Sequence, residues 1–201
     1  MKKKEEGICM RLWTIQPPEV IKIIEENGEF TCDTRLSENY EDFHDAYLWL
    51  IKQMDLKNIF HPKNLDLPLW AWYRYDGKNT QPDLESGMLG IPNQKYACIE
   101  FEIPDNQVLL SDFNAWHYVL NNSWNDDSKN EEEWRKMQDD FDKLDEKPKQ
   151  KLREKSWQKM FDITLKKSDW TSNGYYVQAT FWVLKKSMIK NVTYFTEKEI
   201  D

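Results

Sequence analysis

Ten tryptophans spread over 201 residues are the feature that most limits how this chain can fold. Nine tyrosines and nine phenylalanines accompany them, although only 39% of the residues are hydrophobic and 32% are charged. Disordered chains are poor in aromatic residues, because they cannot bury enough apolar surface to offset the entropy of the chain. We therefore expect this chain to fold around an aromatic core. Its length fits one domain, which usually takes ~100–200 residues.

Charge and cysteine content narrow the class of protein further. The net charge of -8 argues against broad binding of DNA or RNA and against an anionic membrane surface, since both need a basic face. Cys9, Cys32 and Cys98 are widely spaced, form no CxxC pair and are expected to be reduced thiols. No apolar run approaches the ~20 residues that span a bilayer, and none follows the lysine-rich start as in a signal peptide. These features predict a cytoplasmic protein without a membrane partner.

Hydrophobic periodicity predicts an alternation of strands and helices. Residues 11–16 alternate as a strand, and Pro17-Pro18 and Gly28 then frame a helix. Apolar residues at spacings of three and four predict a second helix over 37–54. A short helix at 113–120 is expected to be capped by Ser111 or Asp112. Further strands are predicted at 69–75, 96–103, 108–110, 175–184 and 189–195. Strict alternation at 96–103 sets Ile99, Phe101 and Ile103 against Cys98, Glu100 and Glu102, which predicts a half-buried strand with one polar face.

The composition changes between residues 121 and 150, where Asp, Asn, Glu and Lys dominate. Apolar residues recur there at helical spacing, which predicts a solvated helical insertion over 125–147 that ends at Pro148. Another helix is expected over 150–161. Residues 1–9 are predicted to be a disordered lead-in, and residues 10–201 a single compact α+β domain. Its helices would pack on a mixed or mostly antiparallel sheet.

The strand at 69–75 carries the leading candidate for a ligand site. Trp70, Trp72 and Arg74 share one face, where indoles can stack on a flat ligand and a guanidinium can bind phosphate. The same tryptophans would also suit plain packing, because the side chain buries a large area and needs only one acceptor. The residues proposed to bind a ligand are Arg11, Trp13, Thr14, Gln16, Trp70, Trp72, Tyr73, Arg74, Trp116 and Gln178.

Motifs for catalysis are scarce. Glu100 and Glu102 lie on one face of a strand, ~6.5–7 Å apart along it, which is within the range of paired carboxylates in glycosidases. A solvated acidic face explains them more simply. Cys32 near Asp33 and His44 has no local feature that would lower a thiol pKa. The sequences GxGxxG, GxxxxGK[ST], GxSxG and HExxH are absent, so no cofactor and no metal is predicted. The pattern favours a binding protein over an enzyme, for which Glu100 or Glu102 would be the catalytic candidates.

Several stretches together resemble a family of bacterial and phage domains of unknown function, DUF3841. They are RLWTIQ at 11–16, LPLWAWYRYDG at 67–77, EFEIP at 100–104, LLSDFNAWHYVLNN at 109–122 and VQATFW at 177–182. The resemblance covers nearly the whole chain from Met10 on. It implies a compact single domain in the cytoplasm of a bacterium or a phage-infected cell, and it brings no activity with it.

The segment from Leu12 to Gly28 is also similar to the start of ADP-ribosyltransferase-like folds. In those folds a strand with a threonine, here Thr14, precedes a helix that ends in glycine. Gln178-Ala179-Thr180 stands where they usually carry a catalytic glutamate, and their first-strand histidine is missing. The likeness implies a pocket for an NAD- or ADP-ribose-like molecule without the transferase activity, and it is a likeness of fold alone.

Three functions are consistent with these features. The leading hypothesis is binding of a nucleotide-derived, phosphate-bearing small molecule, such as NAD, ADP-ribose or a cyclic nucleotide, in an aromatic pocket. One form of it is a phage sponge that sequesters an immune signal. The second is an enzyme of ADP-ribosyl or nucleotide chemistry that uses Glu100 or Glu102. The third is a protein-interaction module whose helix within 126–144 docks on a partner. The oligomeric state stays open, a homodimer included.

Overall fold

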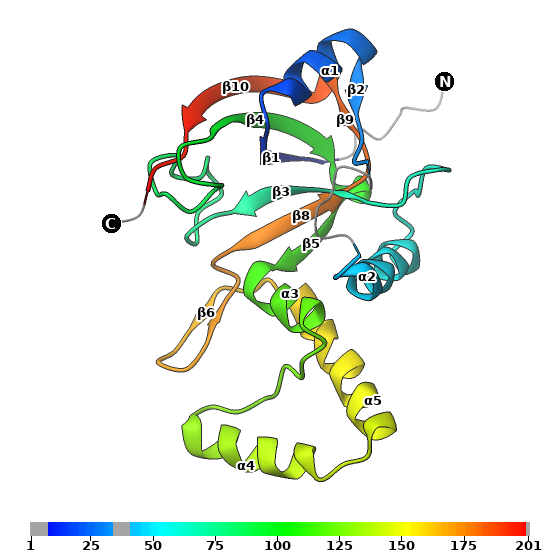
Figure 1. Cartoon of the computed structure of the whole chain (residues 1–201), viewed down its shortest axis with the longest axis vertical. Coiled ribbons are helices and arrows are strands. Elements are labelled where there is room, and N and C mark those ends of the chain that lie inside the picture. The colour runs from blue at the N-terminus through cyan, green and yellow to red at the C-terminus, as the bar shows by residue number, and fades with distance from the viewer. Residues whose placement is uncertain (1–7, 34–40, 200–201) are drawn as a thin grey trace.

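A six-stranded antiparallel sheet organises the computed structural model, which describes residues 8–33 and 41–199 (Figure 1). Its strands are β1 (Cys9–Gln16), β3 (Leu69–Arg74), β4 (Lys95–Pro104), β5 (Leu109–Asp112), β8 (Val177–Phe181) and β10 (Ile189–Thr196). They lie in the order β10-β4-β1-β3-β8-β5, and each neighbouring pair is antiparallel. The prediction of an α+β fold with an antiparallel sheet is confirmed.

Helices and short ribbons surround this sheet. The α-helices are α1 (Glu19–Asn27), α2 (His44–Leu56), α3 (Phe113–Leu120), α4 (Glu131–Asp142) and α5 (Glu146–Trp157). The 3-10 turns within the described residues are η2 (Asp105–Gln107), η3 (Gln158–Phe161) and η4 (Lys186–Met188). Two small antiparallel ribbons pair β2 (Glu29–Phe30) with β9 (Leu184–Lys185), and β6 (Lys166–Lys167) with β7 (Ser172–Asn173). None of the described helices is long and apolar enough to cross a bilayer.

Each strand sends alternate side chains to opposite faces of the sheet, so the two faces carry different residues. The face toward α1, called the α1 face, buries an apolar core against Val20 and Ile24 of that helix. Leu12, Ala71, Ile99, Phe101, Ala179 and Phe181 are its strand residues. The strict alternation at 96–103 therefore predicted the buried side of β4 correctly.

The opposite face carries Trp13, Trp70 and Trp72 and is called the tryptophan face. At one end Trp70 and Leu109 join a second core with residues from α2, α3, α5 and η3. Leu50, Met54, Trp116, Val119, Trp157 and Met160 are buried in that core. Figure 1 shows α2 and α3 beside this end of the sheet, at β8 and β5.

Local signals located most element ends. Gly28 ends α1 in the left-handed region at φ 81°, and Asp112 caps α3 by accepting a hydrogen bond from the backbone N–H of Ala115 at 2.8 Å. Both agree with the sequence prediction. The predicted lead-in lies largely outside the described residues, but Cys9, its last residue, is already in β1. The predicted strand at 175–184 is divided, because β8 ends at Phe181 and β9 pairs elsewhere.

Two predicted helix boundaries are corrected. The helix predicted over 37–54 begins at His44 in the described chain, after a turn at 41–43, while residues 37–40 lie outside that part. Pro148 does not separate the later helices, because it lies in the first turn of α5. Backbone N–H groups there have no partner within the helix, so proline is tolerated. The break falls at 143–145 instead.

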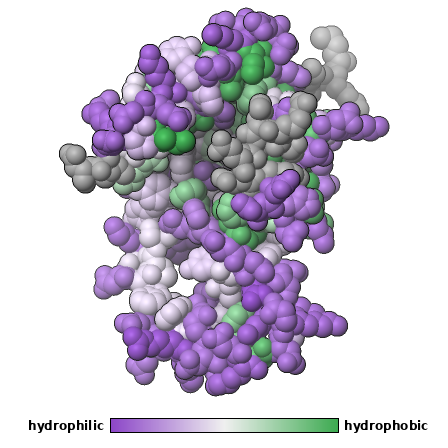
Figure 2. Space-filling model, in the orientation of Figure 1, coloured by the Kyte–Doolittle hydropathy of each residue, from purple (hydrophilic) through white to green (hydrophobic). Residues whose placement is uncertain are grey.

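The acidic helix α4 lies inside the segment predicted as a solvated insertion. Residues 131–136 are all exposed, and Phe141 is its buried residue. Figure 1 places α4 at the outer end of the molecule, and Figure 2 shows mainly hydrophilic side chains over that end with a few hydrophobic ones among them. The helix and its solvation were thus predicted, whereas docking of a partner through it stays a prediction.

Candidate functional site

One row of side chains crosses all six strands on the tryptophan face. Directly paired residues of antiparallel strands project to the same side of the sheet, so the strand pairing defines the row. From β10 to β5 its members are Asn191, Glu100, Trp13, Trp72, Gln178 and Ser111. This central row brings together residues from six strands between Trp13 and Asn191, and two of its side chains are indoles.

Several polar groups of this face have unused hydrogen-bonding capacity. Trp13 is 3% exposed and Ser111 is 0% exposed, yet Trp13 Nε1 and Ser111 Oγ have no hydrogen-bond partner. Thr180, two residues after Gln178 on β8 and on the same face, is also fully buried with an unpartnered hydroxyl. The side-chain amide of Gln178 makes no hydrogen bond within the described part of the chain. Because buried polar groups in proteins are nearly always satisfied, these groups are left to be satisfied by a ligand or by water.

Trp72 forms the centre of an aromatic wall at the same place. Its ring lies 5.1 Å from the ring of Tyr75 at 89°, 5.2 Å from Phe113 at 60° and 6.4 Å from Tyr176 at 71°. Such edge and tilted contacts are the favoured geometries of aromatic pairs. All four rings are only half-buried, so the wall keeps aromatic surface available for stacking.

The charged residues of this face gather on β1, β4 and β10. Arg11 is 55% exposed, with Nε 3.5 Å from Glu100 Oε1 and Nη2 3.4 Å from Glu102 Oε1. Lys190 Nζ lies 3.0 Å from Glu102 Oε2, and its hydrogen bond is the main reason why the pKa of Glu102 is lowered. A general acid needs a raised pKa, so these surroundings suit Glu102 to charge pairing and not to proton donation.

Arg74 contacts the backbone of its own chain. Its Nη1 donates to the carbonyl oxygens of Ile163 at 2.9 Å and Gly174 at 2.6 Å. A β-bulge between Trp72 and Arg74 shifts the pairing there, so Arg74 lies opposite Val177 and outside the regular row. Both protons of Nη1 are thereby engaged, and the guanidinium holds two loops against β3.

The other predicted ligand-binding residues lie on the α1 face or in the second core. Thr14, Gln16 and Tyr73 project to the α1 face, on the far side of the sheet from the central row. There Gln16 Nε2 donates to Thr14 Oγ1, which itself donates to the carbonyl oxygen of Trp70, both at 2.8 Å. Trp70 and Trp116 pack in the second core with ring centroids 5.4 Å apart. Of the predicted set, only Arg11, Trp13, Trp72 and Gln178 lie together.

Sequence reasoning overlooked Ser111, Thr180 and Asn191. Alternation along β5 could have placed Ser111 on the same side as Leu109, since the two are separated by one residue. No local signal aligns it with Gln178 and Trp72, because that alignment depends on which strands are neighbours in the sheet.

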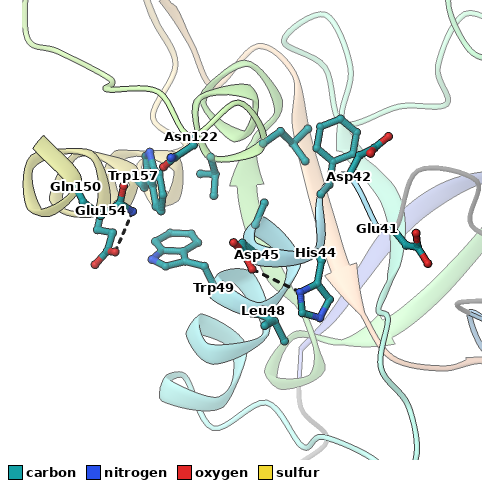
Figure 3. A pocket seen from close by; sticks show the side chains of 14 residues that line it. Glu41, Asp42, His44, Asp45, Leu48, Trp49, Asn122, Gln150, Glu154 and Trp157 are labelled. Carbon is teal, nitrogen blue, oxygen red and sulfur yellow. Dashed lines mark hydrogen bonds and ion pairs between the residues drawn. The ribbon is translucent and has the colours of Figure 1, made fainter. Parts of the chain in front are cut away.

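A cleft of about 660 Å³ lies away from the central row, between α2, α3 and α5 (Figure 3). Figure 3 shows Trp49 and Trp157 on its walls and carboxylates around them. The acidic residues that line it are Glu41, Asp42, Asp45 and Glu154, and no Lys or Arg is among its described lining residues. The resulting negative potential opposes an anionic ligand, so a phosphate-bearing molecule is better matched to the central row.

Thiol or metal chemistry receives little support. Burial, helped by the charge of Glu100, raises the pKa of Cys98 to about 12, and burial likewise raises the pKa of Cys32. The thiolate is the reactive form, so neither residue is an activated nucleophile. Within residues 8–33 and 41–199 no three His, Cys, Asp or Glu side chains are grouped to hold a metal ion.

Fold and site together define an α+β protein whose antiparallel sheet presents a tryptophan- and amide-bearing face. The chain belongs to the DUF3841 family, described as a domain of unknown function, whose model matches residues 11–190. Neither the comparison with curated proteins nor the comparison with solved structures gives a match. The likeness to ADP-ribosyltransferase-like folds stays a prediction.

Proposed function

We propose that the chain binds a nucleotide-derived, phosphate-bearing small molecule on the central row of the tryptophan face. The observation that carries the proposal is the combination of the unpartnered Trp13 N–H, Ser111 hydroxyl and Gln178 amide with the half-buried ring of Trp72. A nucleobase presents a flat aromatic surface and an edge of donors and acceptors. A nucleobase would therefore stack on the ring of Trp72 and hydrogen-bond the unpartnered polar groups at the same time.

The base in this proposal stacks on Trp72 while its edge faces Gln178. Base–aromatic stacking contributes ~1–3 kcal/mol per base. A glutamine amide supplies both a carbonyl acceptor and an NH₂ donor, so it can match the edge of several bases. An unsatisfied buried donor such as Trp13 Nε1 costs ~1–3 kcal/mol, and a ligand acceptor would recover that energy on binding.

Arg11 is assigned to the phosphate, because Nη1 of Arg74 is already bound to two carbonyl oxygens. Arg11 has to exchange its contacts with Glu100 and Glu102 for the ligand. Exposed ion pairs contribute only ~0–1 kcal/mol, so the exchange is inexpensive. Lys190 stays hydrogen-bonded to Glu102 when the guanidinium turns away, which keeps that carboxylate paired.

This proposal has the ligand held without being converted. Glu102 is ion-paired with a lowered pKa, and burial raises the thiol pKa values of Cys32 and Cys98, so none of these three residues is suited to act as an acid or a nucleophile. A protein that retains a signalling nucleotide unchanged would act as a sponge for an immune signal in a phage-infected cell. An enzyme of nucleotide chemistry is the alternative, and product formation separates the two.

The test is a thermal-shift screen against NAD, ADP-ribose, linear nucleotides and cyclic di- and trinucleotides. A ligand specific for the native state raises apparent stability by ~2.7 kcal/mol at a hundredfold excess over Kd. We expect one class to shift Tm, with Gln178→Leu and Arg11→Gln each weakening its affinity by roughly tenfold or more. Gln16→Leu is the matched control, since Gln16 lies on the α1 face.

Either of two results would overturn the proposal. One is the absence of a shift with all of these nucleotides. The other is equal affinity for the hit in folded Gln178→Leu and Gln16→Leu proteins, which would place the ligand away from the central row. Chromatography of the incubated mixture would then show intact ligand for a sponge and a new product for an enzyme.

A further inference from the structure

A separate, smaller cleft of about 310 Å³ lies beside the ends of β4 and β9. Its walls are mainly apolar and come from segments distant in the sequence. Phe60, Ile103, Val183 and Met188 supply apolar surface, and Gln107 and Lys185 supply polar groups. The volume is at the lower end of the range for small-molecule sites, ~300–1,000 Å³. None of these residues belongs to the central row.

Trp182 also lines this cleft, and its indole N–H has no partner. The residue is 4% exposed, so the orphan donor is removed from bulk water. Its ring stacks on the imidazole of His61, with ring centroids 4.0 Å apart and an interplanar angle of 11°. The imidazole is itself held by a 2.7 Å hydrogen bond between His61 Nε2 and the carbonyl oxygen of Leu65. The indole is thus held in place beside the cleft, and its buried N–H is an unused donor.

The charge of the cleft has one sign. Lys185 lines it and makes no ion pair with any of the residues that the structure describes. No Asp or Glu is among the described lining residues, and Glu29, which lies opposite Lys185 in the ribbon of β2 and β9, forms no ion pair with it. An unpaired ammonium and an unsatisfied indole N–H beside apolar walls are complementary to an anion with an apolar body. One cation and one fixed donor suit a singly charged group better than a phosphate.

We propose that this cleft binds a small apolar molecule that carries one carboxylate. The apolar body lies against Ile103, Val183 and Met188, and the carboxylate pairs with Lys185 and accepts the hydrogen bond of Trp182 Nε1–H. His61 is a positioning residue that keeps the indole in its orientation. The proposal is independent of the nucleotide site, which lies on other residues.

The experiment follows the indole N–H signals of the full chain, labelled with nitrogen-15, during titration with phenylacetate and with octanoate. The Trp182 signal is identified as the one missing from Trp182→Phe. We expect it to shift saturably with both carboxylates, and phenylacetamide, which lacks the charge, to bind on the order of tenfold more weakly. Lys185→Gln should weaken phenylacetate binding by a similar factor, whereas Lys186→Gln, its neighbour outside the cleft, should leave it unchanged.

The outcomes decide the proposal in both directions. A saturable shift that depends on Lys185 and not on Lys186 supports it. No saturable shift of the Trp182 signal at millimolar carboxylate, or equal binding by the two lysine variants, overturns it. Lys185→Gln removes an exposed side chain and should fold normally, so the test stands even if Trp182→Phe is unstable, and the melting temperature of each variant verifies this.

Discussion

At the scale of single residues, a network of hydrogen bonds surrounds the backbone of Gly174. Asp112 is 2% exposed, and its two carboxylate oxygens accept from the backbone N–H groups of Ala115 and Gly174 at 2.8 and 2.6 Å. Arg74 binds the carbonyl oxygen of the same glycine. Gly174 has φ +72°, and a Cβ added there would lie 2.5 Å from the carbonyl oxygen of Ile163. This hydrogen-bond network connects β3 and β5 with the segment that leads into β8, at one end of the sheet.

Replacing Gly174 tests how much this close packing of the backbone contributes to stability. Gly174→Ala should lower the free energy of unfolding by more than ~2 kcal/mol, since it adds a backbone clash to the cost of a left-handed φ. Gly28→Ala is the control, because Gly28 has φ +81° with nothing within 4 Å of an added Cβ. That variant should lose only ~1 kcal/mol. Urea unfolding measures both, and equal losses would show that the close contacts at Gly174 carry no strain.

At the scale of elements, α4 is anchored at one end. Phe141 is 8% exposed and stacks on Trp124 at 4.9 Å and 14°, with Lys149 Nζ and the guanidinium of Arg153 each 5.5 Å from its ring centroid. Trp134, earlier in the helix, is 43% exposed. The protein-interaction hypothesis rests on that exposed indole, while Phe141 accounts for the attachment of the helix to its own chain.

The anchor makes a testable difference between the two aromatic residues of α4. Phe141→Ala should release the helix, because the Phe-to-Ala change in a buried site removes about 3 kcal/mol of packing. Native-state amide exchange of residues in α4 should then accelerate, while exchange in α3 stays unchanged. Trp134→Ala should alter neither. Slow exchange of α4 in a folded Phe141→Ala protein would mean that other contacts hold the helix.

At the scale of the whole molecule, one sheet separates two apolar cores. Leu12 belongs to the core on the α1 face and Leu50 to the core on the opposite side, and both are fully buried. Strand β3 contributes Leu69 and Ala71 to the first core and Trp70 to the edge of the second. A strand that serves both cores couples them, because losing either removes packing from the same backbone.

Shared strands predict a single cooperative transition. Leu12→Ala and Leu50→Ala should each lower the stability of the same transition by ~2–5 kcal/mol. Tryptophan fluorescence and far-ultraviolet circular dichroism should give coincident unfolding curves for the parent protein and both variants, which is the test of two-state behaviour. A second transition that moves in only one variant would show that the cores unfold separately.

Local patterns in the sequence determined much of this fold. Alternation at 96–103 identified both the strand and its buried side, the Pro17-Pro18 and Gly28 signals framed α1, and Asp112 marked the start of α3. These signals act over a few residues, through side-chain alternation, preset proline geometry and caps, so no distant partner is needed to recognise them. Helix α2 was placed less well, since no side chain caps its start.

Only the tertiary structure decided which side chains meet. The central row depends on the order β10-β4-β1-β3-β8-β5 and on the register of each pair, which join Trp72 to Gln178 and Trp13 to Glu100. Register between distant strands is a global outcome of packing both faces, and a slip by one residue would turn every side chain to the other face. For the same reason the sequence could identify Arg74 as a strong donor, while only the fold showed that its Nη1 binds two backbone carbonyl oxygens.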